Sequence, residues 1–179
     1  MTRKDMERLL TRYGDAIDGF CCHLAGSRDA GEELYQDTML KVFELMDRIQ
    51  IRNDEEDELL SVRNYCMGVA VRLFRNRNRR EAMRAHLSVD DEENGLGYVI
   101  SDGPDPEELY EKKQEVLSIR AAIRSLPEKH REVVYLFYYA EQSIQEIAET
   151  LHIPQGTVKS RLNHAKKALG RLLKEEFIW

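Results

Sequence analysis

The segment from Ser143 to Leu173 carries the pattern of two short helices joined by a tight turn. Ser143 is a favourable N-cap residue, and Glu146 completes a capping box with it, which predicts the start of a helix. Apolar residues then recur at helical spacing as far as Leu151, and Pro154 ends the pattern because the residue before a proline avoids the helical conformation. A second apolar set at helical spacing follows the proline: Val158, Leu162, Ala165, Leu169 and Leu172. The segment therefore predicts a helix-turn-helix.

The second helix of this pair is polar and basic on the side away from its apolar stripe. Residues 154–174 include no acidic side chain, and the start of the helix concentrates the side-chain types that reach base edges and phosphates. Gly156, which has no side chain, would let the backbone approach a phosphate closely. We therefore expect this helix to contact DNA in the major groove.

The candidate DNA contacts on this helix fall into two groups. Arg161 and Lys167 are expected at phosphates, and four polar side chains are expected at base edges. The full candidate set is Gly156, Thr157, Lys159, Ser160, Arg161, Asn163, His164 and Lys167. The base-edge candidates among them are Lys159, Ser160, Asn163 and His164.

The net charge of −6 hides a strong separation of charge along the chain. Residues 62–86 contain seven arginines and one glutamate, whereas residues 87–111 contain nine acidic residues and no lysine or arginine. Within the basic stretch, one set of side chains recurs at helical spacing: Arg72, Arg75, Asn76 and Arg79. Because arginine is well suited to binding phosphate, a second DNA-contacting helix is expected here.

The acidic stretch also carries glycines and prolines, and is expected to be a flexible linker over residues 87–108. It would separate an N-terminal helical domain, residues 1–86, from a C-terminal helical domain, residues 109–179. No segment shows the sustained alternation of a strand. The predicted fold class is therefore all-α, with two small helical domains.

The apolar spacing also predicts helix boundaries within each domain. The first helix ends near Gly26, the second is capped by Asp29, and a third runs from about Ser61 to Met83. The inner face of the second helix is expected to carry Leu34, Met39, Val42, Phe43 and Met46. In the C-terminal domain a helix is expected from about Pro106 to Ser125, and Pro127 is placed at the first position of the next helix.

Composition argues against several classes of protein. No apolar run approaches the length of a membrane span, and the N-terminus reads as an amphipathic helix, so a cytoplasmic protein is expected. Cys21, Cys22 and Cys66 lack the spacing of a zinc site and are expected to be core residues. No nucleophile, base and orienting group can be assembled from them. We therefore expect no catalytic residue, metal or cofactor, and a protein that is not an enzyme.

With these features in order, the whole chain resembles a sigma factor of the extracytoplasmic-function group of the sigma-70 family. The sequence SLPEKHREVVYLFYYAEQSIQEIAETLHIPQGTVKSRLNHAKKAL is similar to region 4, which binds the minus-35 promoter element. The sequence RDAGEELYQDTMLKVFELM resembles the region 2 helix that binds core polymerase, and VRNYCMGVAVRLFRNRNRR resembles the region 2 helix that opens and reads the minus-10 element. Several positions depart from the family pattern. Gly31 replaces a usual acidic residue, His152 stands where glycine is common, Met39 replaces a large apolar or aromatic residue, and Tyr65 is near a position often held by tryptophan. The acidic segment NDEEDE before Ser61 also falls in the loop that, in the family, helps to capture a minus-10 base.

The resemblance implies an alternative sigma factor that directs promoter-specific transcription initiation. Its implied partners are core RNA polymerase, promoter DNA and a membrane-anchored anti-sigma factor, with no small-molecule substrate. The candidates from Gly156 to Lys167 become minus-35 contacts. The implied minus-10 contacts are Arg63, Tyr65, Arg72, Arg75, Asn76 and Arg79. The implied polymerase contacts are Glu33, Leu34, Gln36, Asp37 and Lys41.

Three other interpretations are open from the residues alone. A helix-turn-helix regulator that does not associate with core polymerase would need a sensor domain. An enzyme would have to use the cysteines with His23, and a helical adaptor would use the basic faces to bind an acidic partner. Binding to core polymerase distinguishes the sigma factor from all three.

Overall fold

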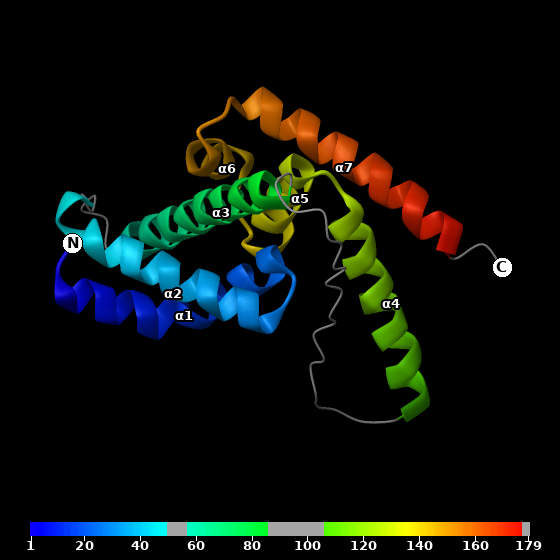
Figure 1. Ribbon diagram of the computed structural model, residues 1–179, viewed down its shortest axis with the longest axis horizontal. Coiled ribbons are helices and arrows are strands. Elements are labelled where there is room, and N and C mark those ends of the chain that lie inside the picture. Colours follow the sequence, from blue (N-terminus) through cyan, green and yellow to red (C-terminus); the bar gives the residue numbers. More distant parts are fainter. Residues whose placement is uncertain (50–56, 86–105, 177–179) are drawn as a thin grey trace. The chain divides into compact units, whose positions relative to one another are not determined.

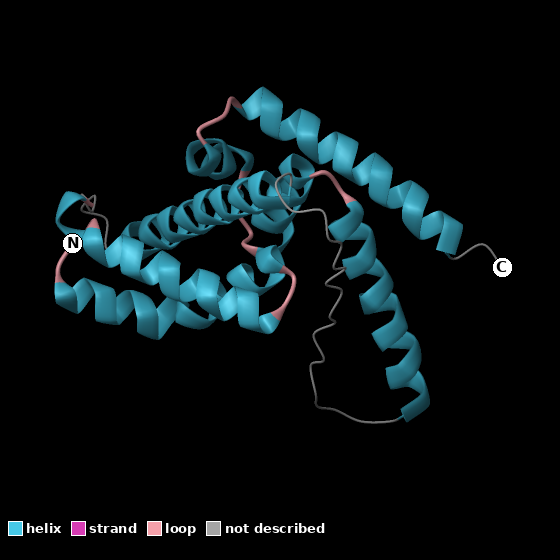
Figure 2. Cartoon of the chain, in the orientation of Figure 1, coloured by secondary structure: helices cyan, strands magenta, loops and turns pink. Residues whose placement is uncertain are grey.

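The computed structural model describes residues 1–49, 57–85 and 106–176 (Figure 1). Every regular element among these residues is a helix, which confirms the all-α prediction (Figure 2). The chain divides into two compact units, Met1–Tyr98 and Val99–Trp179. Residues 86–105, which make up most of the expected linker, lie outside the described residues, and a helix begins at Pro106 within its last three positions.

The first unit consists of α1 (Arg3–Ala25), α2 (Arg28–Glu44), a short 3-10 helix η1 (Met46–Arg48) and α3 (Asp57–Ala85). A capping box between Thr2 and Asp5 starts α1, and the hydrogen bonds to the Asp5 carboxylate lower the pKa of that group. Gly26 ends α1 in the left-handed conformation, with φ 87°, which is why glycine is suitable there.

Ser27, and not Asp29, is the N-cap of α2, so the sequence prediction was wrong by two residues. The Ser27 hydroxyl accepts a hydrogen bond from the backbone N–H of Ala30 at 3.3 Å. Asp29 lies in the first turn, where its negative charge is favourable near the positive end of the helix dipole. Both residue types suit a helix start, and the chain uses the earlier one.

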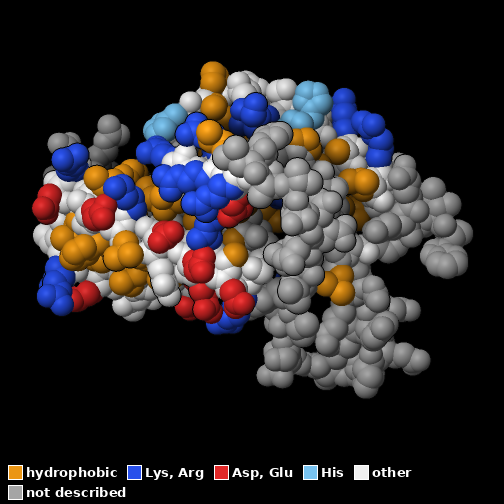
Figure 3. Space-filling model, viewed as in Figure 1, with side chains coloured by type: hydrophobic (Ala, Val, Ile, Leu, Met, Phe, Trp, Pro, Cys, Tyr) orange, Lys and Arg blue, Asp and Glu red, His pale blue; other side chains and the backbone are white. Residues whose placement is uncertain are grey.

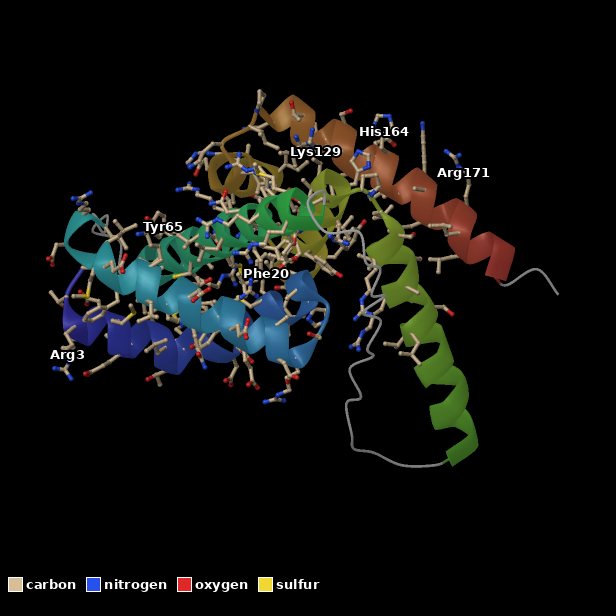
Figure 4. The ribbon with its side chains drawn as sticks, in the orientation of Figure 1. Arg3, Phe20, Tyr65, Lys129, His164 and Arg171 are labelled. Carbon is tan, nitrogen blue, oxygen red and sulfur yellow. The ribbon has the colours of Figure 1, made fainter. Side chains whose placement is uncertain are left out.

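The core of the first unit forms where α1, α2 and α3 pack against one another. Its fully enclosed side chains come from all three helices: Leu9, Ile17, Phe20, Cys21, Val42, Cys66 and Ala70. Phe20 lies between the helices, as Figure 4 shows. Burying large apolar side chains of this kind contributes about 1.5–3 kcal/mol each, so the bundle holds α3 straight along the Asp57–Ala85 length that carries the arginines.

The inner face of α2 is made of small and polar residues more than of large apolar ones. Gly31, Leu34, Thr38 and Val42 are buried, and a Cβ at position 31 would lie 2.4 Å from the Cα of Cys22 on α1. The two helix backbones therefore approach closely at Gly31, and a larger side chain at this position would collide with α1.

The prediction that Phe43 faces inward was wrong, because its side chain is 55% exposed. Leu40 is 63% exposed as well, while Met39 and Met46 are half-buried. The face of α2 opposite its small-residue inner row is thus partly apolar and uncovered in the described unit.

The second unit consists of α4 (Pro106–Ser125), α5 (Glu128–Val134), a π-helical turn η2 (Tyr135–Tyr139), α6 (Ile144–Leu151) and α7 (Gln155–Glu176). The other helices pack on α7 or its neighbours, and one part of the core joins Leu126, Val134 and Ala165. Pro127 is the N-cap of α5 and not its first residue, so that prediction was wrong by one position.

The helix-turn-helix of α6 and α7 has the predicted local structure. The capping box between Ser143 and Glu146 is present in both directions. His152 has φ 53° and ψ 48°, and the N–H of Ile153 donates to the carbonyl of Ala148 at 3.0 Å, which closes the helix end. The inward positions of α7 include Val158 and Leu162, as expected. Leu172 was expected there too and is 37% exposed, so that placement was wrong.

Candidate nucleic-acid interface

On α3, four of the predicted minus-10 residues form one exposed row. Tyr65, Arg72, Asn76 and Arg79 are all exposed and are separated by seven, four and three residues, so they share one helix face. Tyr65 is 38% exposed and projects from the first half of α3 (Figure 4). Lys and Arg side chains gather over α3 in Figure 3. The row combines an aromatic ring for stacking with guanidinium groups for phosphates.

The other two minus-10 candidates, Arg63 and Arg75, lie off this row and are half-buried. The Arg63 guanidinium lies 5.5 Å from the centre of the Tyr13 ring on α1. It also donates to Oδ1 of Asn64 at 3.1 Å. Arg63 therefore packs α3 against α1 in the free chain, whereas Arg72 and Arg79 remain exposed.

On α7, Gly156, Ser160, Asn163 and Lys167 form one exposed row, separated by four, three and four residues. A Cβ at position 156 would meet nothing within 4 Å, so packing inside the unit does not require glycine there. Small polar side chains followed by a lysine fit a helix that inserts its first turns into the major groove.

The remaining minus-35 candidates lie at the two flanks of this row. Lys159 is exposed but is one residue, about 100°, away from Ser160 around the helix. Thr157 and Arg161 are half-buried on the other flank, which faces α5. His164 is exposed on that side, and it projects from the same side of α7 as Arg171 (Figure 4).

His164 has a partner that the sequence did not indicate. Its ring stacks on that of His130 from α5, with ring centroids 5.9 Å apart and planes at 18°. Ser160 Oγ lies 3.5 Å from Nδ1 of His164. Burial, the His164 ring and the Arg161 guanidinium, in that order, lower the pKa of His130 below its ordinary value. The two histidines are 34 positions apart in sequence, so no local pattern could have paired them.

On α2, the predicted polymerase contacts separate into exposed and buried residues. Glu33, Gln36, Asp37 and Lys41 are exposed. Leu34 is only 2% exposed and packs in the core, so its prediction as a contact was wrong. The helical periodicity places it on the inner row with Gly31, Thr38 and Val42, and a partner cannot reach it without unfolding the unit. The exposed Leu40 and Phe43 were missed as candidates for the same outer surface.

Two outer residues of α2 have ionic partners within the unit. Glu33 forms an ion pair with Arg77 of α3, with 2.7 Å between Oε2 and Nη2. Lys41 pairs with Glu44 of the same helix at 2.8 Å. Exposed ion pairs contribute at most about 1 kcal/mol, so both groups can exchange these partners for others.

Cys21 and Cys66 are core residues as predicted, whereas Cys22 is only half-buried. Burial raises the pKa of the Cys21 thiol to about 12 and that of the Cys66 thiol to about 12, so both are protonated at neutral pH and unreactive. Among the described residues, no three His, Cys, Asp or Glu side chains are grouped so that they could hold a metal ion. Within the same residues, no helix has the length and apolar character needed to cross a membrane.

Comparison with known proteins agrees with this arrangement. A family model described as "Sigma-70, region 4" matches residues 117–169, which include α5, α6 and most of α7. The "ECF RNA polymerase sigma factor SigW" of Bacillus subtilis (strain 168) is 27% identical over 165 residues, covering 91% of this chain and 86% of that protein. The "ECF RNA polymerase sigma factor SigE" of Mycolicibacterium smegmatis is 25% identical over 163 residues, covering 91% of this chain and 59% of that protein.

A solved structure supports the fold over nearly the whole chain. The sigma factor RpoE from Bartonella quintana, solved in complex with the anti-sigma factor NepR, aligns with a TM-score of 0.78 and 20% identity. The alignment covers 96% of this chain and 98% of that one. The chain is therefore similar over most of its length to sigma factors of the extracytoplasmic-function group, and its residues 117–169 match region 4 of the sigma-70 family.

Proposed function

We propose that the chain acts as an alternative sigma factor, which binds core RNA polymerase and directs it to initiate transcription at specific promoters. The observation that carries the proposal is that each compact unit exposes its own row of DNA-binding side chains, one on α3 and one on α7. Two separate contacts of different chemistry are what recognition of a two-part promoter requires.

In this proposal the α3 row binds the minus-10 element. Tyr65 stacks on an unpaired base, and Arg72 and Arg79 bind the phosphates of the separated strand. Asn76 lies between the two arginines, where an amide can hydrogen-bond a base. Separating the strands costs a few kcal/mol, which stacking and phosphate neutralisation offset.

The α7 row binds the minus-35 element as duplex DNA. Ser160 and Asn163 are close enough to the helix start to reach base edges in the major groove, and Gly156 lets the backbone lie against a phosphate. Lys167, two turns further along, contributes a phosphate contact. Thr157, Lys159 and Arg161 are flanking contacts to the backbone.

The outer surface of α2 binds core polymerase. Gln36, Asp37 and Lys41 supply polar contacts, and the exposed Leu40 and Phe43 supply apolar area that is solvent-accessible in the free unit. Uncovered large apolar side chains next to polar ones are common at protein interfaces.

The proposal includes an anti-sigma factor that holds the protein inactive, a cytoplasmic location, and no catalysis by the chain itself. Support for the anti-sigma factor comes from the solved sigma factor with the same fold, which is in complex with one. We further propose that the anti-sigma factor is membrane-anchored, as the family resemblance implies.

The first experiment is capture of core polymerase, followed by transcription in vitro and sequencing of the promoters used. We expect Gln36→Ala with Asp37→Ala and Leu40→Ala to reduce capture, because these side chains are exposed and their removal leaves the core intact. Circular dichroism should be unchanged for this variant.

Leu34→Ala is the comparison variant. It removes a buried side chain and should cost about 2–5 kcal/mol of stability, so its defect in capture should appear together with a lower melting temperature. Undiminished capture by the triple surface variant would refute the α2 assignment. Absence of capture by the wild type would instead favour a helix-turn-helix regulator that works without polymerase.

A further inference from the structure

We propose that His130 is a further DNA-contacting residue, which forms a site for one phosphate of the DNA backbone together with Arg161 and His164. The site lies at the flank of the α7 row that faces α5. The inference rests on the proposed function only in that it takes DNA as the ligand of α7, and its test needs no polymerase.

The three side chains are brought together by the packing of α5 on α7. The His130 and His164 rings stack with their centroids 5.9 Å apart, and Arg161 is one turn before His164 on the same side of α7. Ser160 Oγ lies 3.5 Å from Nδ1 of His164, so Nε2 is the nitrogen of that ring left for another ligand. The cluster thus joins the exposed row at Ser160.

Arg161 has a hydrogen-bond donor that the free chain does not use. Its Nη1 is enclosed and has no hydrogen-bond partner, an arrangement that is costly for a charged group. A phosphate oxygen is a suitable acceptor for a guanidinium N–H. The proposed site therefore requires the half-buried Arg161 side chain to turn outward when DNA binds at the flank of α7.

The side chains whose charge lowers the pKa of His130 are basic ones from α7. On its own helix, α5, Glu128, Lys129 and Glu132 also lie within two residues of it. From α7 it faces His164 and Arg161. Beside it on α5 is Arg131, whose Nη1 donates to the carbonyl of Arg124 from α4. In η2, the ionisable residue nearest to His130 in sequence is Tyr135. Burial raises the pKa of the Tyr135 hydroxyl, so this group is neutral at physiological pH. An anion placed against the stacked rings would therefore meet positive charge from two helices.

The sign of the pH effect follows from this arrangement. In the free chain burial and the neighbouring cations disfavour the protonated His130 ring, so the ring is neutral near pH 7. A bound phosphate reverses this preference, because it supplies the missing negative charge. DNA binding therefore takes up a proton at His130, and binding must become tighter as pH falls.

The test is a fluorescence anisotropy titration of the full chain against a short labelled duplex at low salt, at about pH 6 and about pH 8, either side of the ordinary histidine pKa. We expect wild-type binding to be about three- to tenfold tighter at the lower pH, as one added hydrogen bond of typical net strength would give. His130→Asn should lose part of this ratio, and His130→Asn with His164→Asn should bind almost equally at both pH values.

His152→Asn is the matched control, because it removes an exposed histidine from the same unit and asparagine tolerates the left-handed conformation at that position. It should keep the wild-type ratio. A wild-type protein that binds equally at both pH values, or not at all, would overturn the proposal, as would a double variant that keeps the wild-type ratio.

A second measurement avoids substitution. Nuclear magnetic resonance titration of the histidine ring protons should show the pKa of His130 rising when the duplex is added. A pKa of His130 that does not change on addition of the duplex would also overturn the site. Loss of polymerase capture would refute the sigma-factor proposal while leaving both of these results interpretable.

Discussion

The rows on α3 and α7 are both exposed and both basic, yet they differ in composition and in what surrounds them. The α3 row combines one aromatic ring with an amide and two arginines. Other arginines of α3 have partners inside the unit, as Arg63 has Tyr13 and Arg77 has Glu33. The α7 row contains small polar side chains and one lysine. The comparison teaches that arginine and tyrosine suit a separated strand, whereas short hydroxyl and amide groups suit base edges in an intact groove.

The strongest test of this difference is on α3. Arg72→Ala with Arg79→Ala should reduce transcription in vitro on the order of a hundredfold or more, because each charge-assisted hydrogen bond to phosphate contributes about 1.5–3 kcal/mol. Strand opening at the minus-10 element, measured by permanganate reactivity, should fall in parallel. The preference for minus-35 sequence should not change.

The matched control is Arg3→Ala with Arg8→Ala, which removes the same charge from α1 of the same unit. Both side chains are substantially exposed, at 88% and 49%, and pair only with acidic neighbours on their own helix. Transcription by this variant should stay within about twofold of wild type, since surface ion pairs contribute about 1 kcal/mol or less. An equal loss in both double variants would mean that net charge, and not the α3 row, drives strand opening.

The second test is on α7. Ser160→Ala with Asn163→Ala should relax the base preference at the minus-35 element, at a cost of about 1–3 kcal/mol for each lost base contact. Lys159→Ala, at the flank, should weaken binding by a similar factor for all sequences and reduce its salt dependence. A change of base preference in Lys159→Ala alone would show that α7 enters the groove by a different face.

Most of the fold was predictable from local signals, and the reasons for the failures are physical. Caps depend on a few adjacent residues, so the helix start at Ser143 and the end at Gly26 were predicted correctly. On α2, Leu34 and Val42 are buried as expected, but the inner row also contains Gly31 and Thr38, while Phe43 points outward. Hydrophobicity alone therefore identifies only part of the buried side of this helix.

The sequence was sufficient to predict which helices carry the candidate sites. It was not always sufficient to predict which of their side chains are exposed. Spacing alone identified the α3 and α7 helices, whereas the half-burial of Arg63 and Arg161 depends on which neighbouring helix covers that flank. The His130–His164 stack depends on the packing of α5 against α7. Contacts between distant segments of this kind are set by tertiary packing, which no single window of sequence contains.

The smallest expected effect is in the rates at which the three cysteines react with a thiol reagent. These rates report the stability of the first unit alone. Cys21 and Cys66 are enclosed with pKa values of about 12, while Cys22 is half-buried. Iodoacetamide should therefore modify Cys22 slowly in the native protein and the other two thiols only when the first unit opens.

Because all three cysteines belong to the first unit, mass spectrometry of the labelled protein at increasing denaturant gives the stability of that unit separately from that of the second unit. Fast labelling of Cys21 or Cys66 without denaturant would contradict the burial described here.

The contact between Gly31 and Cys22 has a consequence for the surface on the other side of α2. The two backbones are in contact there, because a Cβ at position 31 would lie only 2.4 Å from the Cα of Cys22. Rotation of α2 about its own axis would therefore make it collide with α1. The angular position of Gln36, Leu40 and Lys41 is therefore fixed by a residue that contacts none of them. Grafting the outer residues of α2 onto another helical hairpin would transfer their chemistry, but their direction would be kept only if the recipient hairpin had an equally close crossing.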